Sequence, residues 1–181
     1  MPFSRTIIGT YLIILVNVIV YIKTQENPYL IDKYGLYPDK VLRDKEYYRL
    51  ITSTFMHLNI YHIMLNMYSF YSVGRTLEFL LGTPKFLALY LLMGVLTGLV
   101  ASFARRIFHS SDTISVGASG VMFALFGIFI GSMIRTAGVV TAFKSSLNSL
   151  IPIIILSLIP GIDKYGHFAG LLVGIITGLF L

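Results

Sequence analysis

The residues best suited to chemistry in this chain are a serine and a histidine, each among small residues. Ser119 lies in the stretch SVGASGVMFALFG, between Gly117 and Gly120, and His167 lies in GHFAGLLVGIITG. A serine hydroxyl becomes a nucleophile when a base within hydrogen-bond reach takes its proton. Each residue also has a structural reading, because either can pack between helices. Catalysis requires that the two side chains can meet.

Glycines recur around both residues. The stretch around His167 has a glycine at every fourth position, namely Gly166, Gly170, Gly174 and Gly178. The stretch around Ser119 has Gly120, Gly127 and Gly131 on related helical turns. Small faces let two helices approach closely, and the short serine side chain reaches an imidazole only when the backbones nearly touch. The pattern therefore favours catalysis, with Gly170 in a supporting role.

A second polar group, His62 and Asn66, lies in FMHLNIYHIMLNMYSF. The two residues are four apart and share one face of a predicted helix, whereas His57, five before His62, is expected to face elsewhere. A zinc site is disfavoured because the His-Glu-x-x-His pattern and a third ligand are missing. Two readings stay open: hydrogen-bond donors for an oxyanion in a water-poor site, or hydrogen bonds between helices.

The composition places these residues in a membrane. The chain of 181 residues is 56% hydrophobic and only 12% charged, with a mean hydropathy of +0.80, whereas a soluble domain is about one quarter charged. Lipid must therefore cover much of the surface. The net charge of +6 is spread without a cationic run, which predicts membrane-flanking charge and no nucleic-acid partner. There is no cysteine for disulfide or thiol chemistry, and we expect no metal or cofactor.

Six apolar stretches approach the length of about 20 residues that spans a bilayer. They are Arg5–Ile22, Leu50–Val73, Phe86–Ala104, Val116–Ile134, Ser145–Ile159, which Pro152 interrupts, and Tyr165–Leu181. We expect an all-α polytopic membrane protein with six transmembrane helices, forming a single membrane domain over residues 1–181 with no appended soluble domain. The first stretch is followed by no cleavage site, so a retained helix is favoured over a signal peptide.

The segment Lys23–Arg49 mixes charges with tyrosines, which favour the membrane–water interface. It is expected to lie in the headgroup layer, with an ordinary tethered loop as the alternative. The loop charges do not determine the orientation, because an inside N-terminus leaves nine of the 14 Lys and Arg residues outside.

Four stretches in this order carry a family resemblance: YYRLITSTFMHLNIYHIMLNM, GRTLEFLLGTPKFLALYL, GASGVMFALFG and GHFAGLLVG. Together, from about Tyr47 to Gly174, they resemble the rhomboid family of intramembrane serine proteases. The resemblance implies that Ser119 is the nucleophile and His167 the general base. It also implies an oxyanion hole formed by His62, Asn66 and the Ser119 backbone N–H. Gly117 belongs to the same motif as the nucleophile.

Further expectations concern residues near these positions. Phe123 stands where the family often has a tyrosine that packs on the histidine, so ring stacking is expected to persist without the hydroxyl. Tyr48-Arg49 replaces a frequent Trp-Arg pair, and Glu78 resembles a structural residue of the loop between the second and third helices. Asp163, four residues before His167, is either a helix N-cap or a support for the histidine. The dyad that the resemblance implies favours the cap.

The resemblance also implies a reaction and a topology. Ser119 would form an acyl-enzyme with a transmembrane segment of a substrate protein, which must unwind locally before it can be cleaved. The protein would lie in the cell membrane with a cytoplasmic N-terminus and a site that opens toward the outer face. The fifth span and the loop PGIDKYG would form a movable gate.

Three other classes of protein are disfavoured. GASG lacks the preceding strand and the second glycine of the α/β-hydrolase nucleophile elbow. An inactive rhomboid-like binding protein is expected to lack the serine or the histidine, and both are present. A small transporter or channel is expected to have paired membrane charges or an inverted repeat, and neither is found.

Overall fold

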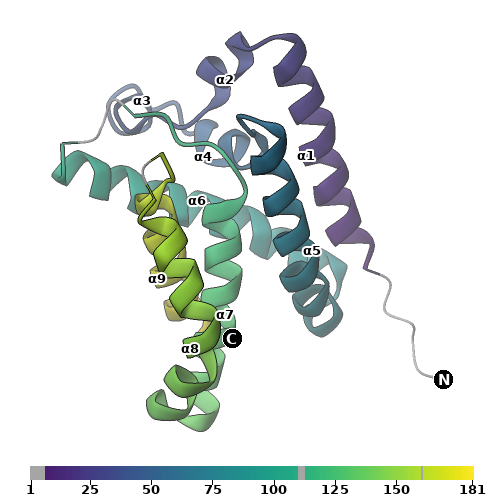
Figure 1. Ribbon diagram of the computed structural model, residues 1–181, viewed down its shortest axis with the longest axis vertical. Coiled ribbons are helices and arrows are strands. Elements are labelled where there is room, and N and C mark those ends of the chain that lie inside the picture. Colours follow the sequence, from purple (N-terminus) through teal and green to yellow (C-terminus); the bar gives the residue numbers. More distant parts are fainter. Residues whose placement is uncertain (1–6, 110–112, 160) are drawn as a thin grey trace.

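The computed structural model describes residues 7–109, 113–159 and 161–181, and these residues form a bundle of helices (Figure 1). The elements are α1 (Ile8–Glu26), α2 (Tyr29–Tyr34), α3 (Pro38–Leu42), α4 (Arg49–Thr52), the 3-10 helix η1 (Ser53–Phe55), α5 (Ile60–Leu81), α6 (Thr83–Ile107), α7 (Ser119–Ala137), α8 (Val139–Ser157) and α9 (Lys164–Gly178). Six long helices in the described residues, α1 and α5 to α9, correspond to the six predicted spans. The prediction of an all-α polytopic membrane protein is confirmed.

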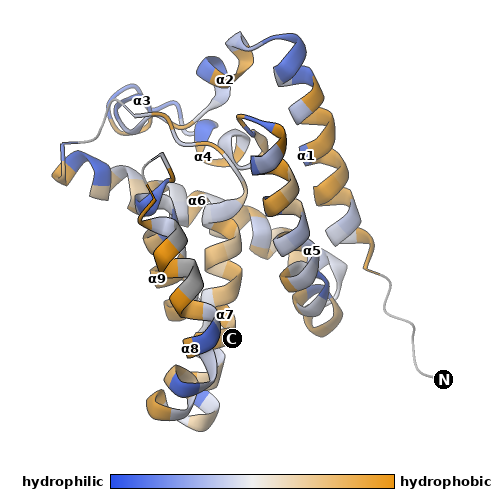
Figure 2. Ribbon diagram, in the orientation of Figure 1, coloured by the Kyte–Doolittle hydropathy of each residue, from blue (hydrophilic) through white to orange (hydrophobic). Residues whose placement is uncertain are grey.

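Apolar side chains cover the outside of the bundle as well as its interior. Hydrophobic residues dominate the long helices (Figure 2), and large apolar side chains on α1 such as Ile8, Leu15 and Ile22 are at least half exposed. Within the described residues, three helices, α1, α6 and α7, are long and apolar enough to cross a membrane, and α9 is a shorter apolar helix. This outward apolar surface is what a lipid environment requires.

The predicted boundary of the second span is wrong by ten residues. The chain from Arg49 to Phe55 forms α4 and η1, and α5 begins only at Ile60 because Asn59 is its N-cap. The Asn59 side chain accepts a hydrogen bond of 2.9 Å from the His62 backbone N–H, which satisfies one of the free donors of the first turn. The distribution of apolar residues in the sequence does not reveal this break between η1 and α5, because the segments on both sides of it contain apolar residues.

Other boundaries differ less. α8 begins at Val139 rather than Ser145, directly after Gly138 with its left-handed φ of 81°, and it continues through position 152 without interruption. Glycine adopts positive φ without steric cost, so Gly138 ends α7 and allows a tight turn. The predicted start of the first span, Arg5, lies outside the described residues.

Glu78 links α5 to α1. It lies in the last turn of α5 rather than in a loop, and it is fully buried. Its carboxylate accepts hydrogen bonds of 2.7 Å from the backbone N–H groups of Gly9 and Thr10, and further bonds from the hydroxyls of Thr10 and Thr83. The first N–H groups of a helix have no partner within it, so Glu78 caps α1 from a neighbouring helix.

Candidate active site

Ser119 is the first residue of α7, at the end of a firmly held segment. Before it, Ser115 exchanges two backbone hydrogen bonds with Leu36, of 2.8 and 3.0 Å, and the Gly117 N–H donates to the Ser53 carbonyl at 2.9 Å. Gly117 has a φ of 117°, and a Cβ there would lie 2.8 Å from His62 Nε2. Only glycine fits both the backbone conformation and the close approach of the imidazole.

His167 lies in the first turn of α9, which packs directly against α7. A Cβ at Gly170 would lie 2.1 Å from the Gly120 carbonyl oxygen, and one at Gly174 would lie 2.0 Å from that of Ala124. No side chain separates the two backbones at these positions. The glycine faces expected from the sequence therefore do meet, and they bring the start of α9 beside the start of α7.

The imidazole of His167 is held from two sides. The Phe123 ring stacks on it, with the centroids 4.1 Å apart and the planes 13° from parallel. The Ser157 hydroxyl lies 2.9 Å from His167 Nδ1, and both side chains are buried. Because a partner on one ring nitrogen fixes the role of the other, Ser157 leaves Nε2 for a second partner. Among the described residues, no direct hydrogen bond joins the Ser119 and His167 side chains.

His62 and Asn66 both lie in the first turns of α5. The Asn66 amide Nδ2 donates to the His62 carbonyl at 2.8 Å, which uses one of its two hydrogens. The expectation that His57 faces away from His62 is wrong, because His57 precedes α5 and its ring lies edge-on to that of His62 at a centroid distance of 4.9 Å. In the described residues, no group of three His, Asp or Glu side chains could hold a metal ion.

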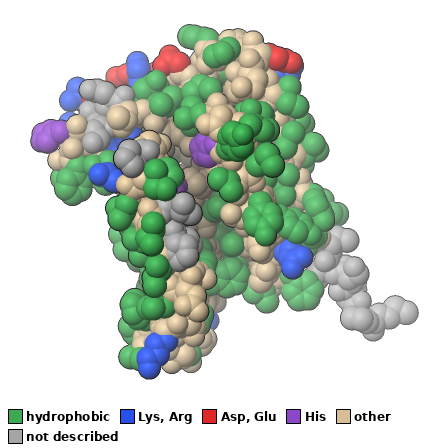
Figure 3. Space-filling view, in the orientation of Figure 1, with side chains coloured by type: hydrophobic (Ala, Val, Ile, Leu, Met, Phe, Trp, Pro, Cys, Tyr) green, Lys and Arg blue, Asp and Glu red, His purple; other side chains and the backbone are tan. Residues whose placement is uncertain are grey.

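One cavity of about 470 Å³ lies between α5, α7 and the start of α9. Its lining includes the five candidates His62, Asn66, Ser119, Phe123 and His167. The space-filling view shows a hollow on this face of the molecule, with a histidine side chain visible in it (Figure 3). Most of the other lining side chains are apolar, so polar groups converge in an otherwise apolar cavity, which is the usual form of a binding site.

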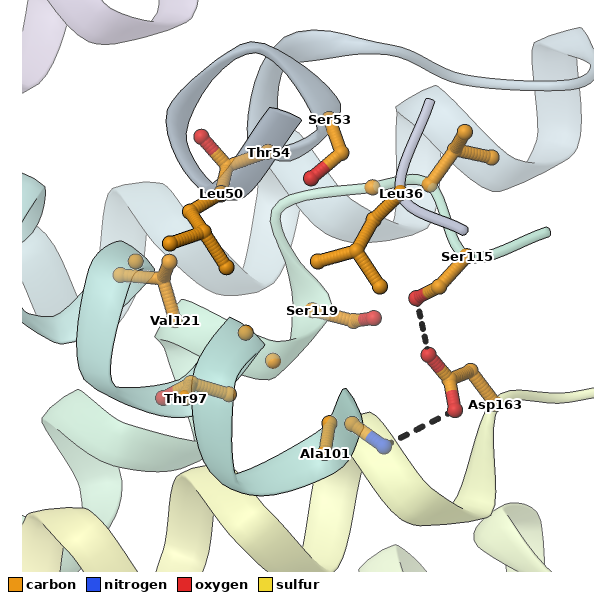
Figure 4. A pocket seen from close by; sticks show the side chains of 16 residues that line it. Leu36, Leu50, Ser53, Thr54, Thr97, Ala101, Ser115, Ser119, Val121 and Asp163 are labelled. Atoms are coloured by element: carbon orange, nitrogen blue, oxygen red, sulfur yellow. Dashed lines mark hydrogen bonds between the residues drawn. The ribbon is translucent and has the colours of Figure 1, made fainter. Parts of the chain in front are cut away.

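A second, smaller cavity of about 30 Å³ also has Ser119 in its lining (Figure 4). Its polar lining includes Ser53, Thr54 and Thr97. Ser115 and Asp163 line both cavities, so these two residues belong to the wall between them.

Asp163 has the N-cap geometry expected from the sequence. Its Oδ1 accepts from the Gly166 N–H at 2.8 Å, and the carboxylate also accepts from the Ser115 hydroxyl and lies 2.5 Å from Arg105 Nη2. Burial alone raises the pKa of the Asp163 carboxyl, but the Arg105 charge and these hydrogen bonds outweigh it and hold the pKa below its usual value. Asp163 therefore remains ionised at neutral pH.

Two residues near the site were not identified from the sequence. Ser157 is a single polar residue in the apolar run IPIIILSLIP, and a polar group in such a run is itself a reason to expect function. Arg105 had been counted only as a loop charge, although its side chain is 4% exposed. Only the fold reveals that its partner is Asp163, 58 residues later.

These features define a polytopic helical membrane protein with a serine, a histidine and amide donors converging on one cavity. Residues 44–181 match the Rhomboid domain family model, so the chain belongs to the rhomboid family, and the resemblance drawn from the sequence is confirmed.

Relatives from plants and bacteria share the match. The chain is 31% identical over 153 residues to RHOMBOID-like protein 5 of Arabidopsis thaliana, covering 82% of this chain and 48% of that protein. It is 30% identical over 171 residues to RHOMBOID-like protein 6, mitochondrial, of the same plant, covering 87% and 53%. It is 28% identical over 182 residues to Rhomboid protease GluP of Bacillus subtilis, covering 91% and 33%. The chain thus spans about half or less of the length of these relatives.

Proposed function

We propose that this protein is an intramembrane serine endopeptidase that cleaves transmembrane segments of other proteins with a Ser119–His167 dyad. The observation that carries the proposal is the single cavity that Ser119, His167, His62 and Asn66 line together. The bacterial relative is named as a rhomboid protease, which supports the same reaction class.

His167 acts as the general base. Its Nδ1 is engaged by Ser157 and its ring is held flat against Phe123, so Nε2 is the nitrogen that accepts the Ser119 proton as the hydroxyl attacks the scissile carbonyl. In the described part of the chain, no carboxylate is hydrogen-bonded to the ring. Asp163, the nearest acid along the chain, has its oxygens occupied by Ser115, Gly166 and Arg105.

The oxyanion forms beside the N-terminus of α7. As the first residue of this helix, Ser119 has a backbone N–H with no acceptor within the helix, and the helix dipole favours negative charge at this end. The His62 ring and the second hydrogen of Asn66 Nδ2 add side-chain donors from α5. Removal of one such donor from an oxyanion hole costs about 100- to 1,000-fold in kcat.

The substrate is a transmembrane segment that unwinds before cleavage. Helical carbonyls are already hydrogen-bonded, so the nucleophile reaches the peptide only after local unwinding. The cavity suits an apolar extended peptide because Leu58, Leu65, Met122 and Phe126 line it. His167 passes the proton it took from Ser119 to the leaving amine, which departs as the first product and leaves Ser119 acylated. Water entering from the open end of the cavity then gives a proton to His167 and attacks the ester. His167 returns that proton to the Ser119 oxygen as the carboxylic acid product leaves.

The same proposal includes the topology. Ser119 and His167 each lie at the start of a helix, at the end of the bundle where Leu36 pairs with Ser115. With the N-terminus in the cytoplasm, this end lies at the outer face of the cell membrane. α8 and the loop after it form the gate for lateral entry, although Pro160 of that loop lies outside the described residues.

Cleavage of a model transmembrane substrate in detergent tests the proposal. Ser119→Ala and His167→Ala are each expected to abolish cleavage. Ser132→Ala, on the same helix with its hydroxyl directed to the Gly178 carbonyl, and His109→Ala, at an exposed position, are the matched controls and are expected to cleave normally. Undiminished cleavage by either dyad variant would refute the assignment.

A further inference from the structure

A buried ion pair connects the two segments that carry the proposed catalytic residues. The Asp163 carboxylate accepts hydrogen bonds from the Ser115 hydroxyl and, at 2.8 Å, from the Gly166 N–H. It also forms an ion pair with Arg105, whose Nη2 lies 2.5 Å away. The Arg105 side chain is 4% exposed and that of Asp163 is 17% exposed. Figure 4 shows Ser115 and Asp163 pointing toward each other beside Ser119. The pair is thus largely buried, and salt screens it less than it would an exposed pair.

Arg105 also binds the chain that leads into α7. Its Nη1 donates to the Thr113 carbonyl at 2.9 Å and to the Thr113 hydroxyl, while its guanidinium lies over the Tyr165 ring, 5.6 Å from the centroid. One side chain at the end of α6 therefore contacts residues on both sides of the site. The planar guanidinium suits this because it donates in several fixed directions.

The position of the pair along the chain is informative. Ser115 lies four residues before Ser119, and Asp163 lies four residues before His167. The members of the Ser115–Asp163 pair and of the Ser119–His167 pair are therefore each 48 residues apart along the chain. Asp163 caps the turn of α9 that contains His167. A shift at the Ser115–Asp163 contact is therefore transmitted to Ser119 through the short non-helical segment 115–118, and to His167 through the first turn of α9.

N-capping alone does not account for the charges. A neutral Asn or Ser caps a helix about as well as Asp, whereas burying a carboxylate with a guanidinium carries a desolvation penalty comparable to the attraction between them. The ion pair adds what a cap lacks, which is a link from α9 to α6 and to the segment before Ser119.

We infer that Arg105 and Asp163, together with Ser115, form a clasp that positions Ser119 and His167 relative to each other. The three are positioning residues, because they act through the dyad and do not react. The inference rests on the proposed function, and it predicts that loss of the clasp slows acylation more than it weakens substrate binding.

Charge-removing variants separate this role from capping. Asp163→Asn keeps a cap acceptor and removes the charge, and Arg105→Gln removes the partner. Each is expected to lower kcat and the rate of fluorophosphonate labelling of Ser119 by about 10- to 100-fold, since small misplacements of reacting groups are that costly, with KM changed less than threefold. The double variant is expected to lose far less than the product of the single losses, because both disrupt one contact. Arg106→Gln, at the exposed neighbouring position, is the matched control and is expected to label at the wild-type rate.

Two kinetic results would overturn the clasp: a wild-type labelling rate in Asp163→Asn, or losses in the double variant that simply multiply. If Arg105→Gln does not fold, Asp163→Asn still tests the clasp, because this variant retains the helix N-cap. A wild-type protein that neither cleaves nor labels would instead refute the proposed function. In that case amide hydrogen exchange still tests the clasp, because the measurement needs no enzymatic activity. The exchange rate should rise in Asp163→Asn at residues 113–118 and 163–167. Unchanged protection at these residues would overturn the clasp.

Discussion

Gly170→Ala tests whether the direct contact of α7 and α9 creates the site. An added Cβ at Gly170 would lie 2.1 Å from the Gly120 carbonyl oxygen, where ordinary contact begins at about 3.4 Å. Its neighbour is backbone, so no side chain can rotate away. The two helices must move apart by about 1 Å at this level, one turn from His167.

The expected result is a large loss of rate with a folded protein. A displacement of about 1 Å in a catalytic group costs about 100-fold, which corresponds to about 2.7 kcal/mol in the barrier. The assay is the rate of Ser119 labelling by a fluorophosphonate, with thermal unfolding measured on the same samples to establish that the variant is folded.

Gly94→Ala is the matched control for this substitution. Gly94 lies on α6, where a Cβ would meet the Thr54 methyl group at 3.3 Å and otherwise only contacts of 3.6 Å or more, so a slight adjustment accommodates it. This variant is expected to label within about threefold of the wild-type rate, since helical Gly→Ala changes also gain up to about 1 kcal/mol in propensity. If Gly170→Ala labels as fast as Gly94→Ala, the argument that close backbone approach creates the dyad is wrong.

Three further predictions follow from single contacts. Ser157→Ala should lower kcat by about twofold to tenfold at unchanged KM, because the loss of one net hydrogen bond of about 0.5–1.5 kcal/mol corresponds to a rate change of that size. Full activity would show that Ser157 does not orient His167. Glu78→Gln should lower the free energy of unfolding, measured by chemical unfolding in detergent, by about 1–3 kcal/mol, because an NH2 group replaces one of the two acceptor oxygens and leaves a buried backbone N–H of α1 without an acceptor. An unchanged stability would contradict its capping of α1. The pKa of Asp163 is lowered in the folded protein, so its charge stabilises the fold at neutral pH and this contribution is lost as the pH falls through that lowered pKa. Thermal unfolding of wild type and Asp163→Asn should therefore converge on acidification, and a pH-independent difference would contradict the ion pair.

The sequence predicted the features that depend on local patterns. Apolar length predicted the six long helices, and glycines at every fourth position predicted the α7–α9 contact, because both are properties of one helix face. The Asp163 cap was predicted for the same reason, since capping depends on residues three apart along the chain.

What the sequence did not predict depends on contacts between distant segments. The start of α5 at Ile60 is set by one cap within an apolar run, and that shift also brings His57 to His62. The Arg105–Asp163 pair and the Ser157–His167 contact join residues of different helices. The sequence shows that these residues are polar or charged, but their spacing along the chain does not specify which residue each one contacts.

The most direct test of the central claim is the site of covalent labelling. Purified protein in detergent is treated with a fluorophosphonate, and the modified residue is identified by peptide mass spectrometry in wild type and in His167→Ala. The proposed dyad predicts modification at Ser119 in the wild type and a rate reduced to background in His167→Ala. Modification at another serine, or equal labelling of Ser119 without His167, would contradict it.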